Sequence, residues 1–204
     1  MMTKIKFCGL TRIEDIKAVN DLKPEFIGFV FWPMSKRVVT REQASELKAV
    51  LDPSIKAVGV FVDEDTDIVK ALLNDDIIDI AQLHGSEDGA YINELKSSTG
   101  KPVIKAFRIR SEDDAKKAEE SPADMVLLDS GMGTGKTFNW EIIKGVKRPY
   151  FLAGGLAPDN AAEAIRELHP YALDVSSGIE TEGIKDIKKM TDFYEAVRKE
   201  DEHD

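Results

Sequence analysis

The stretch Lys56–Val62, KAVGVFV, is a short run of mostly apolar residues in which three are valines. A run that is apolar on both faces and rich in β-branched residues is typical of a strand buried in a parallel sheet. Before it, Thr40 and Gln43 have the spacing of a capping box, which predicts the start of a helix. After it, the spacing of Ile68 and Leu72 predicts another amphipathic helix. The stretch therefore belongs to an alternation of helix and strand.

Seven further runs of this kind occur along the chain. They are KIKFCG from Lys4, FIGFVF from Phe26, IDIAQLHG from Ile78, PVIKAFR from Pro102, DMVLLDS from Asp124, YFLAGG from Tyr150 and YALDVSSG from Tyr171. Successive starts lie 21 to 30 residues apart, enough for one strand, one helix and two short loops. Eight such units favour a closed (β/α)₈ TIM barrel. An open doubly wound sheet remains the alternative, because periodicity does not reveal closure.

Two more helix starts are expected from local signals. Thr11 and Glu14 have the capping-box spacing, and Pro158 suits the first turn of a helix. No tract rich in Pro, Gly and Ser divides the chain, so we expect one domain over residues 1–204. Residues 200–204, EDEHD, are expected to form a solvated acidic tail.

Composition limits the class of protein and its partners. Of 204 residues, 42% are hydrophobic and 32% charged, which is typical of a folded globular domain. The formal net charge of -10 repels phosphate backbones and anionic bilayers, so neither nucleic acid nor a membrane is an expected partner. An anionic small molecule would have to be held by local features such as helix N-termini or arginines. We expect a monomer or homodimer.

Cys8 is the single cysteine, so no internal disulfide can form and a reducing compartment is the simpler assumption. No stretch resembles a signal peptide or reaches the roughly 18 apolar residues of a membrane span. These observations predict a cytoplasmic protein.

The carboxyl ends of barrel strands carry the reactive groups of such folds. The seventh and eighth runs end in Gly154, Gly155, Ser176, Ser177 and Gly178. Unobstructed backbone N–H groups and hydroxyls at this place suit a phosphate group. The alternative is that these glycines only permit tight turns.

Cys8 and Asp129 end the first and sixth runs. Cys8 is either a small buried apolar residue or a base or nucleophile, which would need a lowered pKa. Asp129 either caps its own loop or acts as an acid or base at the rim.

Three further polar residues follow strand ends. Arg37 suits a substrate carboxylate, or is a solvated cation. His84 could orient a substrate oxygen, or be structural. Asp174 could bind sugar hydroxyls or position a neighbour. No pair among the three histidines has metal-ligand spacing, so no metal is expected.

The segment from Asp129 to Trp140, DSGMGTGKTFNW, ends almost like a loop that holds ATP phosphates. That loop requires a glycine five residues before its Gly-Lys-Thr, and here the position is Ser130. It also normally follows the first strand of a sheet, whereas this segment lies past the midpoint of the chain. ATP binding is therefore disfavoured.

At these strand ends the chain resembles the phosphoribosylanthranilate isomerase family of tryptophan biosynthesis. The matching segments are KFCGLTR, GFVFWPMSKRVVT, VGVFVD, QLHG, LLDSGMGTGKTFNW, FLAGGLAPDN and DVSSGIETEGIKD. They run in order from residue 4 to about residue 186, which is nearly the whole chain.

The resemblance implies a (β/α)₈ barrel that performs an Amadori rearrangement of N-(5′-phosphoribosyl)anthranilate without cofactor or metal. It implies that Cys8 is the general base and Asp129 the general acid, with Arg37 near the anthranilate carboxylate. The loops after the seventh and eighth strands would hold the phosphate. Lys136, in the loop after the sixth, is a hypothetical contact for an anionic group.

Three other functions fit the sequence less well. A histidine-pathway type of isomerase with two aspartates is disfavoured by Cys8, and an indole-forming synthase by the lack of a lysine at the strand ends and of a longer N-terminal arm. A phosphate-binding barrel without turnover would not need both Cys8 and Asp129.

Overall fold

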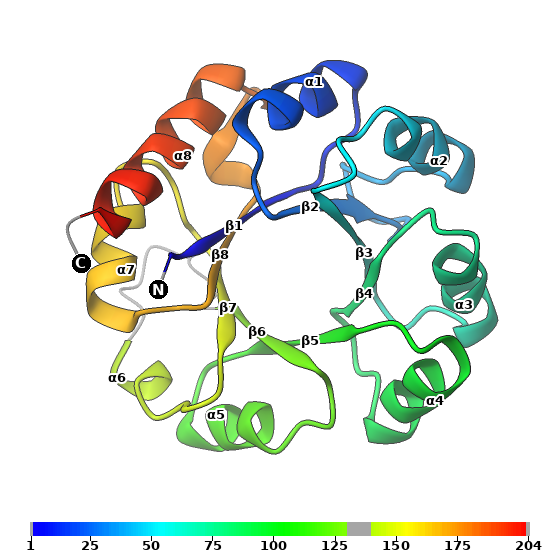
Figure 1. The fold of residues 1–204 in the computed structure, drawn as a ribbon. Helices are drawn as coiled ribbons and strands as arrows, with labels where there is room; N and C mark the ends of the chain where they lie inside the picture. The colour runs from blue at the N-terminus through cyan, green and yellow to red at the C-terminus, as the bar shows by residue number, and fades with distance from the viewer. Residues whose placement is uncertain (1, 130–139, 203–204) are drawn as a thin grey trace.

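The computed structural model describes residues 2–129 and 140–202. Eight parallel strands close into a barrel in chain order, and the first strand pairs with the last. Figure 1 shows these strands as a ring with the helices outside it. The predicted (β/α)₈ barrel is confirmed, and the open sheet is excluded because β1 and β8 are hydrogen-bonded neighbours.

The barrel strands begin within two residues of the predicted runs. They are β1 (Lys4–Cys8), β2 (Phe26–Val30), β3 (Lys56–Phe61), β4 (Ile80–Leu83), β5 (Val103–Arg108), β6 (Met125–Asp129), β7 (Tyr150–Ala153) and β8 (Ala172–Val175). The helices between and after them are α1 (Ile13–Leu22), α2 (Arg41–Ala49), α3 (Thr66–Asn74), α4 (Gly89–Thr99), α5 (Glu112–Glu119), α6 (Trp140–Ile143), α7 (Ala161–Leu168) and α8 (Ile187–Asp201).

Alternation along the strands creates two apolar layers, because successive side chains point to opposite faces. Phe26, Val58 and Phe151 belong to a cluster inside the barrel. Phe7 and Ile27 belong to the larger cluster between the strands and the helices. The strands are thus buried on both sides, which explains their nearly continuous apolar sequence.

The start of α1 differs from the prediction. Its N-cap is Arg12, and the carboxylate of Asp15 accepts the backbone N–H groups of Thr11 and Arg12, each at 3.1 Å. The buried carboxylate of Asp15 takes the place of the predicted pairing of Thr11 with Glu14, because one of its oxygens accepts both N–H groups.

The capping box of α2 is confirmed, and the helical position of Pro158 is not. Gln43 N–H donates to Thr40 Oγ1 at 3.2 Å, and Thr40 N–H donates to Gln43 Oε1 at 2.9 Å. Pro158 lies in a turn before α7, which starts at Ala161. The turn is held by Asn160, which accepts from Ala157 N–H and donates to the carbonyl of Gly155.

A short hairpin after β8 was not predicted. A 3₁₀ turn, η1 (Ser177–Ile179), leads into the antiparallel pair β9 (Glu180–Thr181) and β10 (Ile184–Lys185). Glu182 and Gly183 connect the pair and both have positive φ, as a two-residue type I′ turn requires. Two-residue strands are too short to leave a periodic pattern in the sequence.

Contacts at the amino-terminal end of the barrel join the two ends of the described chain. Thr3 N–H donates to Asp201 at 2.9 Å, and Arg198 donates to the carbonyl of Thr3 and to Glu25. Helix α8 therefore includes Glu200 and Asp201, the first two residues of the predicted acidic tail. Within the described residues, no helix is both long and apolar enough to cross a membrane.

Candidate active site

A cavity of about 230 Å³ lies at the carboxyl ends of the barrel strands. Cys8, His84, Asp129 and Asp174 line it, although they come from four different strands or the loops that follow. The loops after β7 and β8 line it with Gly154, Gly155, Ser176 and Ser177. The structure therefore brings together most of the residues singled out in the sequence.

Cys8 ends β1 beside Gly28 of β2, its partner in register. A Cβ atom at Gly28 would lie only 2.7 Å from Cys8 Sγ, so glycine provides the space that the thiol occupies. The Cys8 side chain is 8% exposed and faces the cavity. Ser176 Oγ donates to the carbonyl of Cys8 at 3.0 Å and thereby fixes the end of β1 to the loop after β8.

The electrostatic surroundings of Cys8 are mixed. Burial raises the pKa of the Cys8 thiol above its ordinary value, and the carboxylate of Asp174 adds to this, while Lys6 and Lys185 oppose it. The lowered pKa that a base would need is therefore not found, because removal from water disfavours the thiolate. The nearby ammonium groups limit this effect.

Arg37 lies at the rim, on the loop after β2, and is half-buried. Its Nε and Nη2 donate to the two carboxylate oxygens of Glu180, both at 2.6 Å, in a fork geometry. Glu180 also accepts from Lys185 Nζ at 2.6 Å. Although burial favours the neutral acid, these bonds hold the pKa of Glu180 below its ordinary value.

His84 connects two polar groups of the cavity. Its Nδ1 lies 3.1 Å from Gln82 Nε2, and its Nε2 lies 3.7 Å from Asp129 Oδ2. His84 therefore lies between Gln82 and Asp129 and faces both.

The predicted phosphate-binding loops approach each other closely. Gly154 and Gly155 have φ of 96° and 66°, a left-handed conformation that glycine adopts without strain. Gly178 lies in η1 against the backbone of Leu156, where a Cβ would come within 1.9 Å of the carbonyl oxygen. Gly178 thus packs behind the cavity, whereas Gly154, Gly155 and the two serines face it.

Four polar residues of this region were missed in the sequence. Lys6 and Gln82 point inward from strands, and Glu180 and Lys185 lie on the unpredicted hairpin. The signal for Lys6 and Gln82 is their position, two residues before Cys8 and His84 respectively, within predicted strands.

The predicted loop GTGKTFNW, including Lys136, lies outside the described residues except for Trp140 at its end. In the described part of the chain, no group of three His, Cys, Asp or Glu side chains is placed to hold a metal ion.

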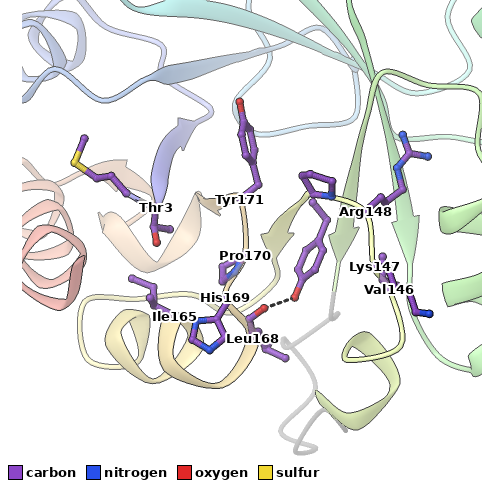
Figure 2. Close-up of a pocket in the computed structure, with 12 residues that line it drawn as sticks. Thr3, Val146, Lys147, Arg148, Ile165, Leu168, His169, Pro170 and Tyr171 are labelled. Carbon is purple, nitrogen blue, oxygen red and sulfur yellow. Dashed lines mark hydrogen bonds between the residues drawn. The ribbon is translucent and has the colours of Figure 1, made fainter. Parts of the chain in front are cut away.

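A second cavity, of about 350 Å³, lies at the opposite, amino-terminal end of the barrel (Figure 2). Its lining includes Arg148, whose guanidinium donates to the backbone carbonyls of Ala118, Glu119, Ser121 and Ala123. Tyr150 donates to the carbonyl of Leu168, the dashed bond in Figure 2. These polar groups connect neighbouring loops, so this cavity does not share the chemistry of the first.

Comparisons with known proteins agree with this site. Residues 5–196 match the family model of N-(5′-phosphoribosyl)anthranilate (PRA) isomerase. The chain is 47% identical to the N-(5′-phosphoribosyl)anthranilate isomerase of Thermoanaerobacter sp. (strain X514), over 97% of this chain and 98% of the relative.

Solved structures give the same result. The phosphoribosyl anthranilate isomerase of Thermotoga maritima superposes with a TM-score of 0.88 at 33% identity, covering 97% of this chain and all 100% of that one. Another such isomerase, in complex with reduced 1-(o-carboxyphenylamino)-1-deoxyribulose 5-phosphate, gives 0.86 at 32% identity, with 97% and 100% covered. The chain therefore belongs to the N-(5′-phosphoribosyl)anthranilate isomerase family.

Proposed function

We propose that this isomerase converts N-(5′-phosphoribosyl)anthranilate into 1-(2-carboxyphenylamino)-1-deoxyribulose 5-phosphate, with Cys8 as general base and Asp129 as general acid. This is a step of tryptophan biosynthesis. The observation that carries the proposal is that Cys8 and Asp129 line one cavity, together with the glycine and serine loops after β7 and β8. A family member that binds a reduced form of the product supports the identity of the ligand.

The reaction is an internal redistribution of protons. Asp129 gives a proton to the furanose ring oxygen, and the ring opens to a Schiff base. Cys8, as thiolate, then removes the proton from C2, which gives an enolamine that tautomerises to the ketone. One acid and one base suffice, because the product is an isomer of the substrate and no electrons leave it.

Other side chains would hold the two anionic ends of the substrate. Arg37 has the planar guanidinium that suits the anthranilate carboxylate. Gly154, Gly155, Ser176 and Ser177 would hold the phosphate, with Gly178 supporting their loops. His84 and Asp174 would contact the ribose portion, although Asp174 Oδ1 also accepts from Lys6.

The small-molecule phosphosugar is the principal partner in this proposal, and the protein acts in the cytoplasm. The isomerase of Thermotoga maritima is dimeric. Light scattering on the purified chain distinguishes the monomer from the homodimer.

The first test measures loss of anthranilate-type fluorescence when the protein is mixed with freshly generated phosphoribosylanthranilate. We expect rapid loss with the wild type and a decrease in kcat of about 10²- to 10⁴-fold for Cys8→Ala and for Asp129→Asn, since each removes a proton-transfer group. Asp113→Asn, which changes an exposed carboxylate on α5, is the control and should retain wild-type rates.

Two results would contradict the proposal. If the wild type is folded but inactive, the protein is a barrel that binds ligands or acts on another phosphosugar. An active wild type with undiminished activity in Cys8→Ala or Asp129→Asn would remove the acid and base assignments.

A further inference from the structure

The acid and base do not account for Lys6, a charged side chain inside the barrel directly below the active-site cavity. Its exposed fraction is 0%, although an ammonium group normally remains in water. Because it is two residues before Cys8 on β1, Lys6 points to the same, inner side of the strand. A buried lysine next to the proposed base calls for an electrostatic explanation.

The strand register places Lys6 against one carboxylate and one thiol. Lys6 pairs with Asp174 of β8 in register, and its Nζ donates to Asp174 Oδ1 at 3.0 Å. The charge of Lys6 also acts on the thiol of Cys8. Both meet at Gly28, where a Cβ would lie 2.7 Å from Cys8 Sγ and 3.2 Å from Lys6 Nζ. Glycine on the neighbouring strand therefore allows the thiol and the ammonium to approach.

The cations around Cys8 outnumber the carboxylates paired with them by one. The cations that interact with Cys8 are Lys6, Lys185 and Arg37. The carboxylates paired with them are Asp174 and Glu180. Across the cavity, His84 Nε2 lies 3.7 Å from Asp129 Oδ2, and neither residue belongs to this group of charges. If Cys8 is a thiolate, the positive and negative charges in the first group are equal in number.

We propose that Lys6 is a positioning residue that stabilises the thiolate of Cys8 through its positive charge, while Asp174 holds the Lys6 ammonium in place. The proposal rests on Cys8 as the base in the proposed function. Its consequence is that Cys8 can remove the C2 proton although it is buried, because the cation that replaces water is already in position.

The charge states of the two groups fit this role. Burial by itself lowers the pKa of Lys6, but Asp174 and Cys8 together raise it above its ordinary value, so Lys6 stays charged. Burial raises the pKa of Cys8, and Lys6 is the strongest of the groups that oppose this. An opposite charge at this range is worth about 1 to 3 pKa units.

A purely structural role for Lys6 makes a different prediction. If the Lys6–Asp174 pair only fills the barrel, its removal lowers stability but leaves the Cys8 titration unchanged. Lys105 provides the matched control, since it is also buried, pairs with the buried carboxylate of Glu87 at 2.8 Å, and belongs to the strand β5. Lys105 has no contact with Cys8.

The experiment titrates Cys8 by its rate of alkylation with iodoacetamide between pH 6 and 11. Since Cys8 is the single cysteine, the loss of free thiol reports on it alone. The variants are Lys6→Met, Lys6→Gln, Lys6→Arg and Lys105→Met, each checked by circular dichroism. Lys6→Gln keeps an amide donor for Asp174, so it tests the charge if Lys6→Met does not fold.

We expect the midpoint of the Cys8 titration to rise by at least about one pH unit in the neutral Lys6 variants. It should stay near the wild-type value in Lys6→Arg and Lys105→Met. The kcat of Lys6→Gln should fall at least about tenfold at pH 7.5, recover partly at higher pH and change more than KM. The proposal would be overturned if the Cys8 midpoint of both neutral variants, or of the one that folds, equals that of the wild type.

This result is independent of the proposed function, because alkylation needs no substrate. If the wild type does not convert phosphoribosylanthranilate but the neutral variants still shift the Cys8 midpoint, the function fails and the Lys6–Cys8 coupling stands. If the wild type is active and Cys8→Ala is inactive, but the midpoint does not move, only the role of Lys6 fails.

Discussion

Glu180 shows how a residue without a proposed chemical step can determine the geometry of the site. Both of its carboxylate oxygens accept from Arg37, and Oε1 also accepts from the buried Lys185. Lys185 in turn donates to the carbonyl of Ser176 at 2.8 Å. The guanidinium proposed for the anthranilate carboxylate is thereby connected to the proposed phosphate loop.

Replacement of Glu180 by Gln should weaken substrate binding. The neutral amide cannot form the forked, charge-assisted pair with Arg37, so we expect kcat/KM to fall about tenfold or more, mainly through KM. Steady-state kinetics measure this, with Glu182→Gln in the hairpin turn as control. Equal kcat/KM values for Glu180→Gln and the wild type would show that Arg37 needs no such support.

For individual residues, the sequence predicts which side chains belong to the site better than it predicts the groups that they contact. Cys8, Asp129 and Arg37 follow strand ends, and their chemistry makes them candidates. The partners Lys6 and Glu180 are not evident, because Lys6 lies within an apolar run and Glu180 meets Arg37 across 143 residues of chain. The raised pKa of Cys8 was also missed, since burial depends on the assembled barrel.

Among the elements, η1 and the loop after β7 depend on each other. Gly178 packs so closely on Leu156 that a Cβ would lie 1.9 Å from its carbonyl oxygen and 2.9 Å from its carbonyl carbon. Backbone cannot move aside as a flexible side chain can. The absence of a side chain at Gly178 therefore sets the spacing of the two loops that carry the proposed phosphate contacts.

Gly178→Ala should separate these loops. We expect a loss of about 1 to 3 kcal/mol in unfolding free energy, as for other substitutions that overpack a site, and a higher KM. Urea unfolding and steady-state kinetics measure the two effects. Gly89→Ala is the control, because its Cβ would meet nothing nearer than Pro122 at 3.5 Å. Wild-type values of both quantities in Gly178→Ala would contradict this account.

The elements also show where local sequence signals fail. Thr40 and Gln43 act as the capping rule predicts, since each side chain accepts the backbone N–H of the other at the start of α2. At α1 the rule points to Thr11, but Asp15 takes the N–H groups instead. The hairpin β9–β10 is stabilised by contacts of Glu180 and Lys185 with the barrel rather than by its own pattern.

For the whole molecule, stability should depend on pH through carboxylates that accept hydrogen bonds at helix starts and in turns. The hydroxyl of Thr181 and the N–H groups of Lys189 and Lys188 lower the pKa of Asp186, the N-cap of α8. The hydroxyl and N–H of Ser86 lower the pKa of Asp63.

Since the folded-state pKa values of these groups lie below the ordinary aspartate value of about 3.9, their stabilisation is present above that value. It is lost as pH falls through the folded-state values. We expect the unfolding free energy to change little from about pH 7 to pH 5 through these groups and to decrease below about pH 4.

Urea unfolding from pH 3 to 7 tests this. As the pH falls, the unfolding free energy of Asp186→Asn should decrease less steeply than that of the wild type. Asp21→Asn, which changes an exposed carboxylate on α1, serves as control with the wild-type slope. If the unfolding free energy of the wild type is the same at pH 3 and pH 7, this account of the pH dependence is refuted.

The architecture as a whole follows from the rhythm of eight apolar runs, since each strand starts within two residues of its run. Closure does not follow from that rhythm. It depends on the register of β1 with β8, in which Lys4 pairs with Ala172 and Phe7 with Val175. Such pairing between distant segments has no signature in the local order of residues.

The seam between β1 and β8 has a consequence for how the protein folds. Every other neighbouring pair in the barrel joins consecutive strands, so those pairings close short loops, whereas β1 and β8 meet only when almost the entire chain is in place. The bonds of Lys6 to Asp174 and of Ser176 to Cys8 both cross this seam. A folding chain therefore cannot assemble its proposed catalytic base with these supports before the barrel closes.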